Sequence, residues 1–355
     1  MKRCEKCILP DTYPQIQFDD DGVCNECKNY KAIEYKGEEA LRKLLSDTVS
    51  HSEWDCLVPL SGGRDSTFTL HQLVKKYKKR VLVYNYDNGF VEPIARENIQ
   101  QIANTLGVKV IYHSSEDDLQ CKNIRWITKQ NISKTPGHVQ AYLCSGCRNG
   151  IWGGAYKVAE EYNIPLIVFG ESSMESGGFK RHIAPHFTPN MAEKLTFMIR
   201  HPHITLKRKI VEKKLHKQFP LPSELSNVQK INLFDYEKWD EDVILTTIRQ
   251  ELGWKQKENQ SSWRFDCQIH ALVNSMVYNM LGMTEKDELY SKMIREGMMT
   301  REEALERIYR SKEDIATELM VAEKVLNRMG MTDNEKKKII QFCKGEPKLK
   351  NDWVV

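Results

Sequence analysis

The sequence lacks any long apolar run and any large excess of charge of one sign. Its 355 residues include 53 Lys and Arg against 49 Asp and Glu, so the net charge is only +4. No stretch approaches the roughly 18 consecutive apolar residues that a membrane-crossing helix needs, and the polar, cysteine-bearing first ten residues do not resemble a secretory signal. We therefore expect a cytoplasmic protein without a membrane partner. The small charge excess also disfavours nucleic acid as a partner.

Internal repeats and low-complexity tracts are absent too, and the chain instead alternates short apolar runs with helical stretches. Its length suits one large or two modest domains. We predict strands at residues 55–60, 81–86, 108–112 and 165–169, and helices at 65–77, 93–106 and 149–162. This alternation is typical of an α/β fold with a doubly wound parallel sheet, which binds ligands at the carboxyl ends of its strands.

Composition divides the chain into four predicted segments. They are a cysteine-rich module at residues 1–30, a helical connector at 31–50, an α/β domain at 51–235 and a helical C-terminal region at 236–355. We expect the later part of the α/β domain, residues 171–235, to be irregular, and we predict helices at 300–310 and 314–328. The helical C-terminal region suits a lid, a dimer surface or a docking face better than a catalytic unit.

The cysteine-rich module contains two Cys-x-x-Cys pairs. Cys4 and Cys7 form the first, and Cys24 and Cys27 form the second after sixteen intervening residues. A reducing compartment disfavours disulfides, and this spacing is typical of four thiolates around Zn²⁺. We predict a zinc ribbon with a structural role, because a closed tetrahedral site leaves no position for a substrate.

A glycine-containing turn between the first predicted strand and the first predicted helix is the sharpest catalytic signal. It contains Ser61, Gly62, Gly63, Arg64, Asp65 and Ser66. Two glycines let the backbone approach an anion closely, and the N-terminus of the following helix presents N–H groups and a positive dipole end. The Gly-Lys-Ser/Thr of a Walker A motif is missing.

This SGG-x-DS turn resembles the pyrophosphate loop of the PP-loop ATP pyrophosphatases, which cleave ATP between its α and β phosphates. The resemblance implies that Ser61, Gly62, Gly63, Asp65 and Ser66 hold pyrophosphate, with Asp65 near Mg²⁺. It also makes Asp65, Ser66 and Arg64 the catalytic candidates, although Arg64 stands where many members have Lys. At later strand ends, Asp87, Asn88 and Gly89 would meet the nucleoside, and Gly170 and Glu171 would serve Mg²⁺ or substrate.

A second set of cysteines consists of Cys144 and Cys147 before a predicted helix and Cys267 far downstream. A pair plus one distant cysteine resembles the PP-loop tRNA sulfur transferases, in which three thiolates hold a 4Fe–4S cluster and leave one iron open. A second zinc site or a pair of reduced thiols are the alternatives. If a cluster is present, its role is either structural or the positioning of substrate.

Several longer blocks resemble the N-acetyl sugar amidotransferases of surface-polysaccharide and sialic-acid-like sugar biosynthesis. These blocks are CEKCILPDTYPQIQFDDDGVCNEC, PLSGGRDST, Tyr86 to Gly89, LFDYEKWDED with ELGW, and SKMIREGMMTREEAL. The resemblance implies an ATP-dependent enzyme that adenylates the acetamido oxygen of an N-acetyl sugar, free or nucleotide-linked. Ammonia then replaces that oxygen to give an acetamidino group, with AMP and pyrophosphate as products.

No segment is recognisable as a glutaminase. The resemblance therefore implies separate glutaminase and cyclase-like subunits, similar to the halves of imidazole glycerol phosphate synthase, that supply ammonia. Two alternatives stay open. One is a cluster-dependent sulfur transferase that thiolates tRNA or a small molecule, and the other is a non-catalytic scaffold that binds ATP.

Overall fold

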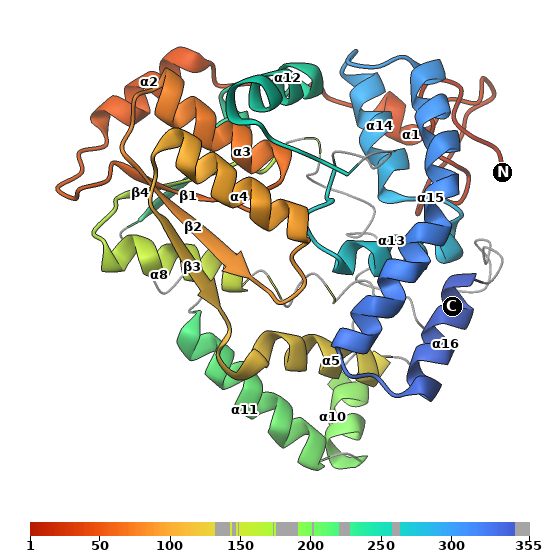
Figure 1. The fold of residues 1–355 in the computed structure, drawn as a ribbon. Helices are drawn as coiled ribbons and strands as arrows, with labels where there is room; N and C mark the ends of the chain where they lie inside the picture. Colours follow the sequence, from red (N-terminus) through yellow and green to blue (C-terminus); the bar gives the residue numbers. More distant parts are fainter. Residues whose placement is uncertain are drawn as a thin grey trace.

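The computed structural model describes residues 1–131, 143, 147, 149–172, 174, 191–200, 202–219, 228–257 and 263–344. It contains a five-stranded parallel sheet in the order β3-β2-β1-β4-β5, of which β1 to β4 are labelled in Figure 1. The strands are β1 (Cys56–Pro59), β2 (Val81–Asp87), β3 (Val110–Ser114), β4 (Leu166–Phe169) and β5 (Gln229–Asn232). After β1 the chain first adds β2 on one side of it, and later adds β4 on the other side. The strand order thus reverses beside β1, and folds of this kind bind ligands at that reversal. The predicted α/β fold with a doubly wound parallel sheet is confirmed.

Helices cover both faces of the sheet because alternate residues of each strand point to opposite sides. On one face, Val58 and Val83 pack with α3 (Arg64–His71) and α4 (Pro93–Leu106). On the other face, Leu57 packs with α8 (Gly154–Glu161) and α11 (Pro202–Gln218). α12 (Glu241–Leu252) packs outside α3 and α4.

The C-terminal helices are α13 (Ile269–Leu281), α14 (Glu285–Arg295), α15 (Arg301–Arg328) and α16 (Asp333–Lys344). They contribute to two cores: α14 and the start of α15 pack in the first core, with α3 and α4, whereas α13, the end of α15 and α16 form a second core with the cysteine-rich module. The other helices among the described residues are α1 (Asn25–Lys28), α2 (Glu38–Asp47), α5 (Leu119–Asn131) and α10 (Met191–Arg200). The chain also has π-helical turns at Gln72–Lys76 and Asn149–Gly153 and 3₁₀ turns at Glu116–Asp118 and Leu233–Asp235. Among the helices described, none is both long and apolar enough to cross a membrane.

Two sequence predictions about these elements are wrong. Residues 171–235 are not irregular throughout, because they include α10, α11 and the edge strand β5. β5 reads QKIN and buries only Ile231, so it carries almost no apolar pattern. The two helices predicted at 300–310 and 314–328 are one continuous helix, α15, since the residues between them contain no glycine or proline.

Candidate functional site

The predicted phosphate loop lies between β1 and α3, at the carboxyl end of the central strand. The hydroxyl oxygens of Ser61 and Ser66 are 3.2 Å apart across the loop. The backbone N–H of Gly63 donates to Ser61 Oγ at 3.2 Å, and that of Ser61 donates to Ser66 Oγ at 3.2 Å. α3 starts directly after Gly63, so the loop combines two hydroxyls with a helix N-terminus, a combination suited to binding an anion.

Residues of α4 and of the ELGW segment contact Gly62 and hold it in place. Its carbonyl accepts hydrogen bonds from Trp254 Nε1 at 2.9 Å and from Asn98 Nδ2 at 3.4 Å. A Cβ on Gly62 would lie 2.3 Å from the carbonyl oxygen of Ala95. The loop thus needs glycine here and is held in one conformation by neighbours distant in sequence.

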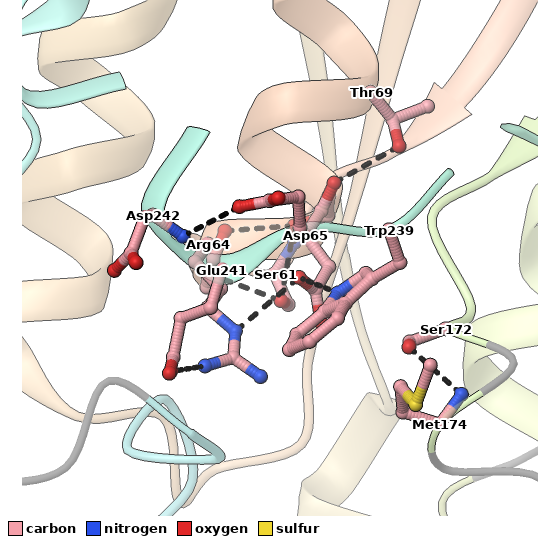
Figure 2. Close-up of polar contacts among 12 residues, drawn as sticks. Ser61, Arg64, Asp65, Thr69, Ser172, Met174, Trp239, Glu241 and Asp242 are labelled. Atoms are coloured by element: carbon pink, nitrogen blue, oxygen red, sulfur yellow. Dashed lines mark hydrogen bonds and ion pairs between the residues drawn. The ribbon is translucent and has the colours of Figure 1, made fainter. Parts of the chain in front are cut away.

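Asp65 and Arg64 contact other side chains of the protein (Figure 2). Asp65 Oδ1 accepts from Trp239 Nε1 at 3.0 Å and from Arg64 Nε at 3.3 Å. Arg64 is only 2% exposed. Its guanidinium lies 4.9 Å from the Trp239 ring centroid, and its Nη1 bonds to Glu241 of α12. Glu241 also pairs with Arg307 of α15 at 2.9 Å, so an ion-pair chain joins the loop to the C-terminal helices.

The end of β4 touches the first turn of α3. A Cβ on Gly170 would lie 2.7 Å from the carbonyl oxygen of Asp65, so the structure brings Gly170 to the loop. The carboxylate of Glu171 instead accepts from Trp152 Nε1 at 3.0 Å and pairs with Lys230 of β5 at 3.3 Å.

The Asp87-Asn88-Gly89 segment forms two successive turns at the end of β2. Asp87 Oδ1 accepts from the Gly89 N–H at 2.8 Å, and Asp87 Oδ2 pairs with Arg96 at 2.8 Å. Asn88 Oδ1 accepts from the Phe90 N–H at 2.8 Å. These contacts hold the turn through side chains of its own residues. They use the side-chain oxygen of Asn88 but not its NH2 group.

The side-chain NH2 group of Asn88 contacts the second set of cysteines. Asn88 Nδ2 lies 3.6 Å from Cys147 Sγ and 3.5 Å from Cys267 Sγ. Gln120 Nε2 lies 3.6 Å from Cys147 Sγ as well. The structure therefore brings two of the three predicted ligands together, and N–H groups near the sulfurs are a feature that tunes thiolate-bound iron. Cys144 lies outside the described residues.

The four cysteines of the N-terminal module converge on one point. Their sulfur atoms all lie within 4.8 Å of one another, and all four residues are buried. Cys4 Sγ is 3.9 Å from Cys27 Sγ, and Cys7 Sγ is 3.8 Å from Cys24 Sγ. Zinc–sulfur bonds of about 2.3 Å in a tetrahedron would place the sulfurs about 3.8 Å apart. The donor set fits a metal.

The charges around these sulfurs also favour a metal. A hydrogen bond with the Cys24 thiol lowers the pKa of Cys27 and of Cys7. The pKa of Cys4 is raised by its hydrogen bond with Cys7, and that of Cys24 by its hydrogen bond with Cys27. The guanidinium of Arg295 in α14 contacts the sulfurs of Cys7 and Cys27 at 3.7 and 3.9 Å. Metal ligation requires thiolates, and this environment favours the thiolate form at Cys7 and Cys27.

Four residues of the site escaped the sequence prediction. Trp239, Glu241 and Trp254 belong to segments that were notable only for a family resemblance, and their contacts with the loop give them a role. The fourth, Asp266, has its Oδ2 3.3 Å from the position that a Cβ on Gly63 would occupy. The only feature of the nearby sequence that draws attention to Asp266 is its position next to Cys267.

Comparison with known families gives one match, in the C-terminal part of the chain. Residues 264–354 match the family model described as LPS biosynthesis protein WbpG-like, C-terminal domain. The match supports the resemblance to the enzymes of surface-polysaccharide sugar biosynthesis and covers Asp266, Cys267 and the helices α13 to α16. No curated protein matches the chain.

Two solved structures are similar to the chain at low scores. The U34-tRNA thiolase NcsA from Methanococcus maripaludis with its 4Fe–4S cluster shares 14% identity over 94% of this chain and 89% of its own, with a TM-score of 0.34. The NMN synthetase from Francisella tularensis shares 14% identity over 79% of this chain and 93% of its own, with a TM-score of 0.36. Scores this low carry no argument. The fold assignment therefore rests on the observed order of the strands.

Proposed function

We propose that this chain, whose C-terminal residues match the WbpG-like domain of LPS biosynthesis proteins, is an ATP-dependent amidotransferase acting on an N-acetyl sugar. The observation that carries the proposal is the loop from Ser61 to Ser66. It presents two facing hydroxyls and a helix N-terminus at the carboxyl end of the central strand, where this fold binds ligands. Such a site suits the pyrophosphate that leaves when ATP is cleaved between its α and β phosphates.

The proposed reaction has two steps. The acetamido oxygen forms a bond to the α-phosphorus of ATP, and the bond from that phosphorus to the β-phosphate oxygen breaks, releasing pyrophosphate. Ammonia then adds to the imidate carbon, a proton is lost, and AMP departs with the former acetamido oxygen. The protein's contribution is positioning and charge stabilisation, with Ser61, Ser66 and the first turn of α3 around the leaving pyrophosphate. Bound Mg²⁺ would neutralise phosphate charge.

The nucleoside would lie toward Asp87, Asn88 and Gly89, which end the neighbouring strand β2. Gly170 and Glu171 end β4 on the other side of β1, so the two segments flank the loop. We assign structural zinc to the N-terminal cysteines Cys4, Cys7, Cys24 and Cys27. Ammonia would come from separate glutaminase and cyclase-like subunits.

The test is a product assay on the purified chain. Acetamido sugars, free and nucleotide-linked, are supplied with ATP, Mg²⁺ and ammonium, and pyrophosphate and AMP are measured. One acetamido sugar should stimulate release of both in equal amounts, and the matching sugar without its acetyl group should not. Formation of ADP, or release that ignores every acetamido sugar, would sink the proposal.

One observation favours a second candidate, a sulfur transferase with a 4Fe–4S cluster. Cys147 and Cys267 share the amide of Asn88, so two predicted cluster ligands lie at the end of β2. Anaerobic purification with iron and sulfide analysis tests for the cluster. Pyrophosphate release stimulated by tRNA rather than by an acetamido sugar would favour thiolation, and ATP binding without turnover would favour a scaffold.

A further inference from the structure

Asp266 reaches the phosphate loop through a short backbone pairing. The Glu92 N–H donates to the Asp266 carbonyl at 3.0 Å, and the Gln268 N–H donates to the Phe90 carbonyl at 2.9 Å. An antiparallel bridge lies between these two bonds. The start of the WbpG-like region is thereby attached to the segment that follows β2, so the position of Asp266 is set by main-chain bonds that most substitutions would leave intact.

The side chain of Asp266 stands beside the loop itself. Its Oδ2 lies 3.3 Å from the point where a Cβ on Gly63 would be, and Ser61 Oγ lies 3.2 Å from the same point. The missing side chain of Gly63 makes room for both oxygens. The carboxylate of Asp266 and the Ser61 hydroxyl, which we assign to pyrophosphate binding, therefore both lie beside Gly63.

A carboxylate in this position would repel bound polyphosphate unless a cation lay between them. Mg²⁺ takes oxygen ligands and is commonly held by one or two carboxylates together with substrate phosphates. The other acid of the loop, Asp65, has its Oδ1 in hydrogen bonds with Trp239 and Arg64. Asp65 is thus engaged in fixing the loop to α12 and the segment before it.

We propose that Asp266 is a ligand of the Mg²⁺ that accompanies ATP, and that Asp65 is a positioning residue of the loop. The inference rests on the proposed use of ATP. It assigns to Asp266 the place near Mg²⁺ that the sequence resemblance implied for Asp65. It also gives the WbpG-like region a direct part in the nucleotide site.

The experiment measures equilibrium binding of α,β-methylene-ATP, whose α–β linkage cannot be cleaved, to the wild type and to Asp266→Asn. Each protein is titrated once with excess Mg²⁺ and once with EDTA. In Mg²⁺ the variant should bind about tenfold more weakly or worse, the scale of loss expected when a metal site is damaged. In EDTA it should bind at least as tightly as wild type, because a negative charge near the phosphates has been removed.

A second readout counts bound Mn²⁺ by electron paramagnetic resonance in the presence of the same analogue, and the variant should lose affinity for the ion. Asp333→Asn is the control, since Asp333 lies at the exposed start of α16 and should behave as wild type in both conditions. Equal weakening in Mg²⁺ and EDTA would reveal a merely structural Asp266, and unchanged binding in both would remove it from the site. A wild type that fails to bind the analogue at all would instead refute the proposed ATP-dependent function.

Discussion

Gly62 is constrained both by its backbone conformation and by its neighbours. Its φ of +82° lies in the left-handed region, and an added Cβ would lie 2.3 Å from the Ala95 carbonyl oxygen. We predict that Gly62→Ala displaces the loop and abolishes binding of α,β-methylene-ATP.

Gly107→Ala is the matched control because Gly107 has a φ of +66° and no atom within 4 Å of its Cβ position. The control should cost about 1–2 kcal/mol in urea unfolding and leave nucleotide binding unchanged. Equal behaviour of the two variants would contradict the assigned packing.

Arg64 gives a second prediction, which separates a structural role from a phosphate-binding role. Its buried guanidinium pairs with Glu241, so Arg64→Ala leaves a buried carboxylate less well compensated and should lower the free energy of unfolding by about 3 kcal/mol. Arg42→Ala, which breaks an exposed pair with Glu38, should cost less than about 1 kcal/mol. If Arg64→Ala weakens ATP binding but leaves unfolding unchanged, Arg64 binds phosphate instead.

The sequence predicts residues of this site only where the signal is local. Ser61 to Ser66 follow one another in the chain, so a strand, a glycine turn and a helix start can be recognised together. Asp266 joins the loop by backbone pairing across distant segments, and Trp254 does so through its indole N–H. Neither contact leaves a periodic pattern. The loop was therefore predictable, whereas the groups that hold and complete it required the structure.

At the scale of elements, the strands buried on both faces were the easiest to predict. β1, β2 and β4 are almost continuously buried, and their apolar runs stand out in the sequence. α4 was predicted with both ends because Pro93 occupies its first turn and Gly107 ends it in the left-handed conformation. β5 has little apolar character as an edge strand, and the polar residues of α11 hide its helical period.

α14 shows why a polar helix can be buried. Arg3 of the cysteine module pairs with Asp287 at 2.7 Å, and Tyr13 donates to Glu288 at 3.1 Å. Both acids are buried, although their helix is rich in charged residues. The helix therefore depends on the cysteine module to satisfy part of its buried charge, whereas its buried Glu285 pairs with Arg264 and His270.

This dependence predicts the effect of removing the zinc that we propose for the module. A chelator that strips the metal should loosen the module, lower the melting temperature and increase amide hydrogen exchange in α14, because metal binding and folding of such a module are coupled. Cys24→Ser should have the same effect, and the chelator should then cause no further loss in that variant. If exchange in α14 stays unchanged when the metal is removed, the module does not support the helix.

At the scale of the whole molecule, the C-terminal region is connected to the loop of residues Ser61 to Ser66 by two independent routes. Arg307 of α15 binds the same glutamate as Arg64, and Asp266 approaches Gly63 directly. Composition alone indicated a lid, a dimer surface or a docking face for this region. The observed contacts mean that a change in the packing of α15 would reach the loop through Glu241.

The thiols of the α/β core and the C-terminal helices help to decide whether this chain could release ammonia from glutamine by itself. A glutaminase of the thiol type needs an accessible cysteine whose pKa is lowered by a nearby base. Among the described cysteines outside the two sets, Cys56, Cys121 and Cys343 are all buried. Burial raises the pKa of Cys56 and Cys343 to about 12 and also raises the pKa of Cys121. These thiols stay protonated and do not suit nucleophilic attack on glutamine.

We therefore predict that the isolated chain uses ammonium and not glutamine. With ATP and the correct acetamido sugar, AMP release at a fixed total ammonium concentration should rise with pH across the neutral range, because only unprotonated ammonia has a lone pair for attack. Glutamine should give no acetamidino product unless a separate ammonia-supplying protein is added. The assay follows AMP and the amidine by mass spectrometry, with ammonium-free glutamine as the matched arm. Glutamine-dependent product from the isolated chain at a rate near that with ammonium would show that the chain contains its own glutaminase.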